Sequence, residues 1–175
     1  MSDACPPGWF AAGSHPPDYA MGMDPDVFCG TMPAVRVSSI QKSCTGFGTL
    51  MQGCPPTEYL GRRVRFSAVV RSSELTDWAG LWFRIDGNAP GEVLGFDNMG
   101  DRKIQGTTDW TRYEVVLDVP RGAARLSIGI LLGGKGTVWM ADSRLEVVAE
   151  DVPLTNQNKP SDDALLHPRN LDLIF

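Results

Sequence analysis

The fold is decided by Trp78-Ala-Gly-Leu-Trp-Phe-Arg-Ile-Asp-Gly87, a stretch in which apolar side chains alternate with a tryptophan and an arginine. Successive side chains of a β-strand point to opposite faces of the sheet. The two sets are Leu81, Phe83 and Ile85 on one face, and Gly80, Trp82 and Arg84 on the other. We interpret the first set as core.

The second face has two interpretations, which the sequence leaves open. An indole beside a guanidinium makes a flat apolar platform with a charged edge, which suits a small organic ligand better than it suits water. Alternatively, a covering loop buries Trp82 and Arg84 pairs with a neighbouring acid. The first interpretation predicts a ligand cleft, and the second predicts additional packing.

Short alternating segments bounded by turn residues extend along the rest of the chain, and none shows a helical period. They predict an all-β fold, a jelly-roll β-sandwich with little or no helix. We expect residues 14–18 to join the first two strands, where paired prolines disfavour helix, and Gly133-Gly-Lys-Gly136 to form a hairpin between the last two. The expected strands are 8–12, 19–23, 34–38, 46–52, 63–71, 78–86, 93–97, 113–119, 125–132 and 137–148.

The expected domain organisation is a sandwich over residues 1–149 and an extended or partly disordered tail over 150–175. The tail ends in apolar residues that are candidates to dock on the sandwich or on a partner: Leu171, Leu173, Ile174 and Phe175. Within the sandwich, Gly46 and Gly48 leave room beside their strand for close approach by another backbone or a ligand.

Composition limits the function classes. The chain has 175 residues and a net charge of −5, which argues against nucleic-acid contact by this chain alone. It shows no basic-then-apolar leader and no long uncharged apolar segment, so we expect a soluble cytoplasmic protein without a membrane partner. Its four cysteines form no CxxC pair and its two histidines are isolated, which disfavours zinc.

The candidate ligand site is the face opposite the core, where we expect several polar side chains to gather. A guanidinium fixed in a cleft can grip a carboxylate or a hydroxyl, and an indole can stack on a ring. For Arg65 and Arg71 taken separately, a solvated face with local ion pairs is the better interpretation. The expected set is Gln52, Arg65, Arg71, Trp82, Arg84 and Asp97.

Two loops are expected to rim this cleft. The segment Phe96-Asp-Asn-Met99 would bring Asp97 as an acceptor and Met99 as an adaptable apolar contact, and an early loop would bring His15 and Tyr19. The sequence contains no nucleophile elbow, phosphate-binding glycine loop or dinucleotide fingerprint. Any catalysis would therefore depend on holding a reactive substrate, with proton transfer by Asp97, His15 or Glu74.

Five motifs in order resemble the galactose-binding-like β-sandwich modules often attached to bacterial AraC-type transcriptional regulators. They are Gly46-Phe-Gly-Thr-Leu-Met-Gln52, Trp78-Ala-Gly-Leu-Trp82, Phe96-Asp-Asn-Met99, Gly106-Thr-Thr-Asp-Trp110 and Thr137-Val-Trp139. The resemblance implies a jelly roll like that of carbohydrate-binding modules, whose concave sheet or loop rim holds a ligand. A more distant resemblance, at the level of fold, is to natural-product cyclases.

One departure from the family concerns calcium. Relatives commonly carry two adjacent acids after the last-strand tryptophan, whereas this chain has Trp139-Met-Ala-Asp142. A structural calcium would have to use Asp142 together with Asp24 or Asp26, since calcium takes six to eight oxygen ligands. Asp142 as a loop-capping residue is the alternative.

Three functional hypotheses follow. The first is a cytoplasmic module that binds a neutral or acidic organic molecule without turnover and without a cofactor. The second is a cofactor-independent cyclase or isomerase of a bacterial natural-product pathway that uses the same cleft. The third is an interaction module that docks through its tail; a homodimer also remains open.

Overall fold

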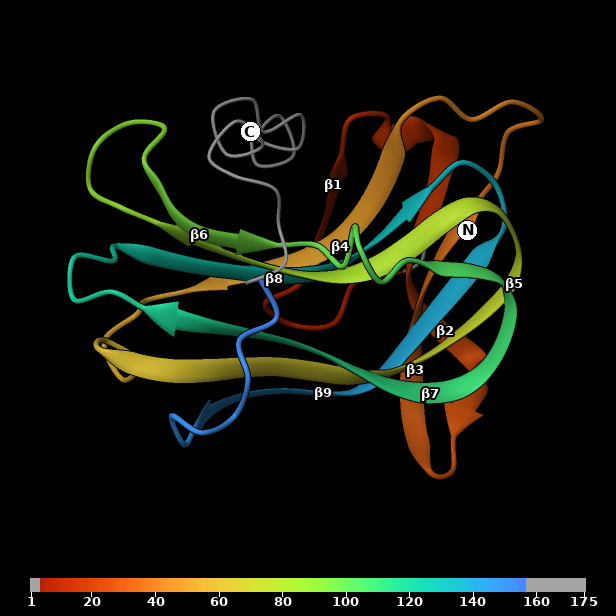
Figure 1. Cartoon of the computed structure of the whole chain (residues 1–175). Helices are drawn as coiled ribbons and strands as arrows, with labels where there is room; N and C mark the ends of the chain where they lie inside the picture. Colours follow the sequence, from red (N-terminus) through yellow and green to blue (C-terminus); the bar gives the residue numbers. More distant parts are fainter. Residues whose placement is uncertain (1–3, 157–175) are drawn as a thin grey trace.

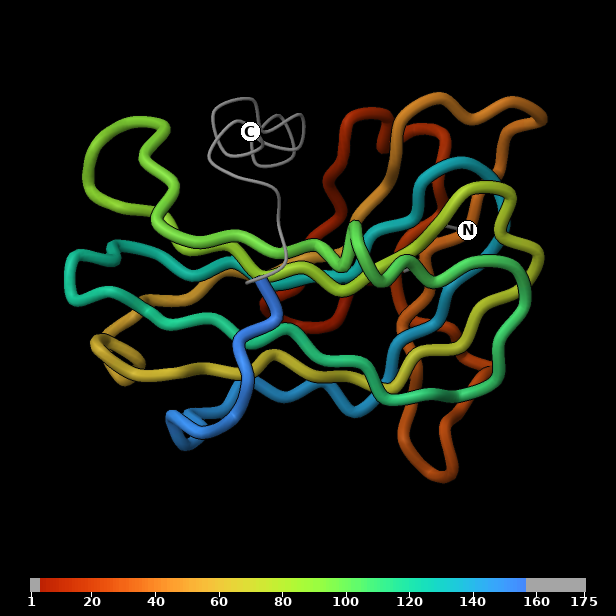
Figure 2. The backbone as a smooth tube through the Cα atoms, in the orientation of Figure 1, coloured from red at the N-terminus to blue at the C-terminus, as the bar shows by residue number. Residues whose placement is uncertain are grey.

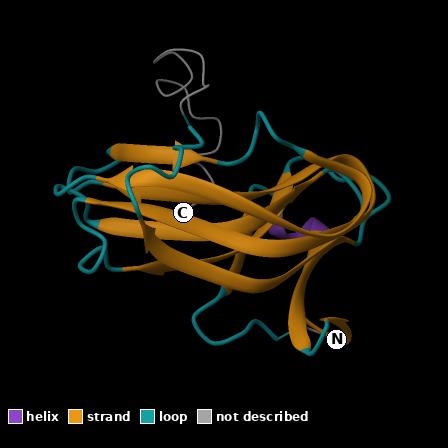
Figure 3. Ribbon diagram, turned by 60° about the horizontal axis from the view of Figure 1, so that its bottom comes forward, coloured by secondary structure: helices purple, strands orange, loops and turns teal. Residues whose placement is uncertain are grey.

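The computed structural model describes residues 4–156 and is built almost entirely from antiparallel strands (Figure 1). Its helical content in this range is one 3-10 turn, η1 (Pro16–Asp18), so the predicted all-β fold is confirmed (Figure 3). The strands are β1 (Phe10–Gly13), β2 (Tyr19–Cys29), β3 (Met32–Ser39), β4 (Phe47–Cys54), β5 (Arg62–Asp86), β6 (Val93–Asp97), β7 (Ile104–Val119), β8 (Arg125–Gly133) and β9 (Thr137–Val148).

Strand β5 organises the fold because it belongs to both layers of the sandwich. Its first half pairs with β7 and β9, and its second half pairs with β8 and β6. The first layer therefore has the order β1-β4-β8-β5-β6, and the second layer has the order β7-β5-β9-β3-β2. Figure 2 shows the chain of β5 turning from one layer into the other at the right-hand end of the view.

The predicted interruption of this strand was wrong. We expected a connector over residues 72–77, yet β5 continues through it with shifts in pairing register, and Glu74 takes a positive φ of 52°. The polar residues there mark the bend between layers and not the end of a strand.

The predicted hairpin at residues 133–136 was also wrong, whereas residues 14–18 join the first two strands as expected. Strands β8 and β9 lie in different layers, so residues 134–136 connect the layers. Strand β1 pairs with β4, whereas β2 pairs with β3. The prolines between β1 and β2 begin η1, because proline fits the first turn of a helix, where its missing N–H is not needed.

The main core lies between the two layers and follows the predicted alternation. Leu81, Phe83 and Ile85 from the second half of β5 are fully buried there, as are Val64 and Phe66 from its first half. Burying side chains of this kind contributes roughly 2 kcal/mol each. The core assignment from period two is confirmed.

Tyr19 fills the space that Gly48 leaves beside its strand. A side chain at Gly48 would begin 2.6 Å from the ring of Tyr19. The Tyr19 hydroxyl donates to the carbonyl oxygens of Gly46 at 3.2 Å and Gly134 at 3.0 Å. The close approach at Gly48 thus comes from a side chain and not from a backbone or a ligand, and Tyr19 fixes two connections.

The segment that follows β9 is described as far as residue 156. Thr155 donates to Asp97 at 2.6 Å and accepts from the Val116 N–H at 2.9 Å, so it lies against β6 and β7. The apolar tail residues Leu171, Leu173, Ile174 and Phe175 lie outside the described residues. Between residues 4 and 156, no helix has the length and apolar character needed to cross a membrane.

Candidate ligand-binding face

Trp82 lies on the outer face of the first layer, opposite the main core, as the alternation predicted. Its exposed fraction is 0%, however, so the expected solvent-facing platform is wrong. The indole lies over Gly129, where an added side chain would begin 2.8 Å from Nε1, and this Nε1–H donates to Thr49 Oγ1 at 2.9 Å. The indole is buried, as in the alternative interpretation, but side chains of neighbouring strands bury it and not a covering loop.

The indole belongs to a second, smaller apolar group that we call the Trp82 cluster. Its buried members are Met51, Trp82 and Leu131, and its partly buried members are Ala12, Phe47, Trp78 and Phe96. Phe10 is 43% exposed and pairs with Met51 in the register of β1 and β4, which places it on the same face. An outer sheet face is usually polar, so this one is unusually rich in aromatic side chains.

The other end of the same face is polar. Arg84 is 2% exposed and forms an ion pair with Asp86, with Nη2 at 2.6 Å and Nε at 2.8 Å from Oδ1. This pairing is the one that the alternative interpretation predicted. Ser127 lies directly opposite Arg84 in the register of β5 and β8, and Arg125 lies opposite Asp86. We call these four residues the polar end.

The other residues expected in this cleft lie elsewhere. Gln52 shares a register position with Ile128 and therefore faces the core side of the first layer. Arg65 lies on the second layer, where it pairs with Glu114 at 3.5 Å and Glu146 at 3.3 Å. Arg71, also on the second layer, lies over the ring of Trp139 at 5.4 Å. The predicted set is divided because alternation gives a residue's face but not its layer.

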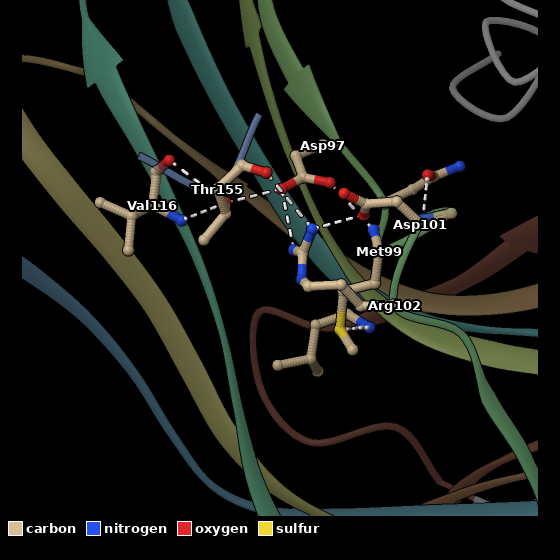
Figure 4. Close-up of polar contacts among 9 residues, drawn as sticks. Asp97, Met99, Asp101, Arg102, Val116 and Thr155 are labelled. Carbon is tan, nitrogen blue, oxygen red and sulfur yellow. Dashed lines mark hydrogen bonds and ion pairs between the residues drawn. The ribbon is translucent and has the colours of Figure 1, made fainter. Parts of the chain in front are cut away.

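Asp97 and Met99 do not rim a cleft. Asp97 is fully buried on the core side and accepts from the Met99 N–H at 3.0 Å, Arg102 at 2.9 Å and Thr155 at 2.6 Å (Figure 4). Met99 is buried, and its sulfur accepts the Leu81 N–H at 3.3 Å. These contacts fix the loop after β6 and the start of the tail.

The remaining candidates for proton transfer lie apart from Asp97. His15 is exposed and contacts Ser14 through Nδ1 at 3.0 Å. Glu74 is exposed at the bend of β5 and lines a separate pocket of about 350 Å³, together with Thr76 and Lys135. Tyr19, expected beside His15, is buried, and desolvation with nearby acidic groups raises its pKa to about 12.

Two of the three proposed calcium ligands, Asp24 and Asp142, have cationic or N–H partners. Asp24 accepts from the Trp139 indole at 2.8 Å, from Arg36 at 3.5 Å and from the Asp26 N–H at 3.1 Å. Burial opposes ionisation of Asp24, but the Trp139 hydrogen bond and further contacts lower its pKa. The structure pairs Asp142 with two arginines, Arg112 and Arg144. In the described part of the chain, no three His, Cys, Asp or Glu side chains gather around a metal position.

Sequence reasoning missed three features of this face: the small residues Ser127 and Gly129, the guanidinium of Arg125, and the aromatic ring of Phe96. The alternation in β8 could have shown the first two, because Leu126, Ile128 and Ile130 take the core side. The pairing that places Ser127 opposite Arg84 had no signal in the sequence.

The fold is that of carbohydrate-binding-module β-sandwiches. The xylan-binding CBM22-1 domain of Paenibacillus barcinonensis Xyn10C superimposes with a TM-score of 0.58 at 14% identity, over 84% of this chain and 90% of that one. A TmCBM61 module in complex with β-1,4-galactotriose gives 0.53 at 12%, over 81% and 90%. The enzymatically active domain of bacteriophage CBA120 tailspike protein 4 gives 0.62 at 16%, over 81% and 20%.

One curated relative is similar in sequence as well. The chain is 41% identical over 165 residues to an uncharacterized HTH-type transcriptional regulator, YbfP, of Bacillus subtilis strain 168. The match covers 94% of this chain and 55% of the relative, so the chain spans about half of the relative's length. No protein-family model matches the chain.

Proposed function

We propose that this chain is the ligand-recognition module of a bacterial transcriptional regulator, and that it binds a small organic molecule on the outer face of the first layer. Carbohydrate-binding folds and a relative named as an HTH-type regulator support this assignment. Fold alone does not give function, so the proposal depends on the site.

The observation that carries the proposal is the aromatic character of this face. The buried members of the Trp82 cluster form the packed centre of the face, and the rings of Phe10, Phe47, Trp78 and Phe96 remain partly or well exposed around them. Ligand sites typically combine aromatic walls with a few fixed polar groups. The polar end supplies such groups on the same sheet.

The acidic charge of the chain fits this role. With a net charge of −5, the module would leave DNA contact to another part of such a regulator and would act in the cytoplasm. A role as a cyclase or isomerase gains no support, because Asp97, His15 and Glu74 lie in three different places and Asp97 is held by Arg102.

The proposal is tested by a thermal-shift screen of the chain against xylohexaose, β-1,4-galactotriose, uronic acids and a bacterial metabolite library. A ligand at about 100 times its Kd stabilises the folded state by about 2.7 kcal/mol, which raises the Tm by roughly 5–10 °C. A screen in which no compound raises the Tm would overturn the proposal.

Two exposed phenylalanines provide a matched pair for locating the site. Phe10 lies on the proposed face, whereas Phe28, 50% exposed, lies on β2 of the second layer. Phe10→Ala should weaken binding about 5- to 10-fold, the value of one stacking contact, and Phe28→Ala should not. If both variants bound the ligand with the affinity of the parent, the ligand would not be contacting Phe10, and the proposed face would be wrong.

A further inference from the structure

Three small or polar residues form a row across three neighbouring strands at the polar end. Gly53 of β4 lies opposite Ser127 of β8, which lies opposite Arg84 of β5. All three are on the same outer face as Trp82. Ser127 is fully buried and Arg84 nearly so, although neither faces the main core.

Two hydrogen-bonding groups in this row have no partner. Nε and Nη2 of Arg84 contact Asp86, but Nη1 is buried without an acceptor. The hydroxyl of Ser127 is also buried without a partner. Buried polar groups are nearly always satisfied, and leaving one unpaired costs stability. Because Arg84 and Ser127 lie opposite each other in neighbouring strands, a single acceptor can satisfy both groups.

The charge at this position favours an anion. The guanidinium of Arg125 folds over Gly53, since a side chain there would begin 2.6 Å from its Nη2. In the part of the chain that the structure describes, no carboxylate forms an ion pair with Arg125. Arg84 is paired with Asp86, whereas Arg125 has no ion-pair partner among the described residues, so one guanidinium charge is left to attract an anion in a protein of net charge −5.

We propose that Arg84, Ser127 and Arg125 form a carboxylate subsite, so that the ligand of this module is an acidic organic molecule. One carboxylate oxygen would accept from Arg84 Nη1 and from the Ser127 hydroxyl, and Arg125 would add long-range attraction. A carboxylate suits the site better than a dianionic phosphate, because its single charge balances the local excess and Asp86 repels further charge. The inference rests on the proposed function for the position of the rest of the ligand, against Phe96 and the Trp82 cluster.

The smallest probe of this subsite is acetate, with acetamide as its neutral counterpart of the same shape. Titration of the chain should move the Arg84 Nε–H signal in nitrogen-15 NMR spectra with acetate, and leave it unmoved with acetamide at the same concentration. D-galacturonate should bind more tightly than its methyl ester. The subsite is overturned if acetate moves the signal no more than acetamide does. A water molecule that stays bound and satisfies both groups would give this result.

Variants separate the subsite from general effects on the fold. Ser127→Ala leaves the Arg84–Asp86 pair intact and should weaken the binding of acetate and of galacturonate about 5- to 10-fold. Arg84→Gln should abolish the preference for galacturonate over its methyl ester. Arg62→Gln, an exposed arginine of the second layer, should change neither. An equal loss in Arg62→Gln and Ser127→Ala would overturn the inference. Binding of a neutral ligand that depends on Phe10 but not on Arg84 would overturn the subsite and leave the proposed function standing.

Discussion

Gly129→Ala should reveal the packing of the buried indole. A methyl group at this position would lie 2.7 Å from the Leu50 carbonyl oxygen and 2.8 Å from Trp82 Nε1. The first contact is with backbone in the adjacent strand, which cannot move freely, and the second displaces the indole from Thr49. Overpacking costs about 1–3 kcal/mol and the lost hydrogen bond about 1 kcal/mol more. Replacing glycine by alanine also restricts the unfolded chain, which stabilises the folded state by roughly 0.4–1 kcal/mol.

The expected net loss in the free energy of unfolding is therefore about 2 kcal/mol, or a fall in Tm of roughly 4–8 °C for a chain of this length. Urea unfolding monitored by tryptophan fluorescence and circular dichroism measures both. Gly122→Ala is the matched control, because a side chain there meets nothing within 4 Å, and its stability should stay within about 0.5 kcal/mol of the parent.

A double-mutant cycle isolates the contact with the indole. In a Trp82→Phe background the cost of Gly129→Ala should shrink by at least about 0.5 kcal/mol, because the displaced ring is smaller. The reasoning is refuted if Gly129→Ala is as mild as Gly122→Ala, or if the two substitutions add without coupling.

Three further outcomes test other parts of the structure. Ser127→Ala should keep the free energy of unfolding or raise it by up to about 1 kcal/mol, because it removes an unpartnered hydroxyl. Ser72→Ala should lower it by about 1 kcal/mol, because that buried hydroxyl contacts Gly106 and Thr108. Equal losses for the two variants in urea unfolding would contradict this. Burial raises the folded-state pKa of Tyr19 to about 12 from 10.0, so up to about 2 kcal/mol of stability present below pH 10 should disappear as the pH rises through about 12. Tyr19→Phe should flatten this pH dependence of the free energy of unfolding. A pH profile that is the same in the variant and the parent would count against this role of Tyr19. Asp97→Ala should cost about 3 kcal/mol, because three donors lose their buried acceptor; a loss below about 1 kcal/mol in thermal unfolding would rule out this role.

The core was predictable because it depends only on local alternation. Leu81, Phe83 and Ile85 face the main core, and Gly80, Trp82 and Arg84 face away from it, as period two requires. The same rule cannot say what covers the outward face. Trp82 is buried by Met51 and Leu131, which come from strands that are distant in sequence and adjacent only through the pairing of β4, β8 and β5.

The composition of the site was less predictable for a related reason. Arg65 and Arg84 occupy equivalent outward positions of one long strand, yet the bend near Glu74 places them on opposite layers. Polar residues at that bend resemble a connector in sequence, since both need turn-compatible side chains. Ser127 became a candidate only when its unpartnered hydroxyl and its position opposite Arg84 were visible in the structure.

The binding face is tested most directly by an amide chemical-shift map of the chain saturated with the strongest compound from the screen. The account predicts that the largest changes lie on the first layer, at Met51, Phe96, Ser127 and their strand neighbours. Changes centred instead on the second layer around Arg71 and Trp139, or changes spread without a centre, would contradict it.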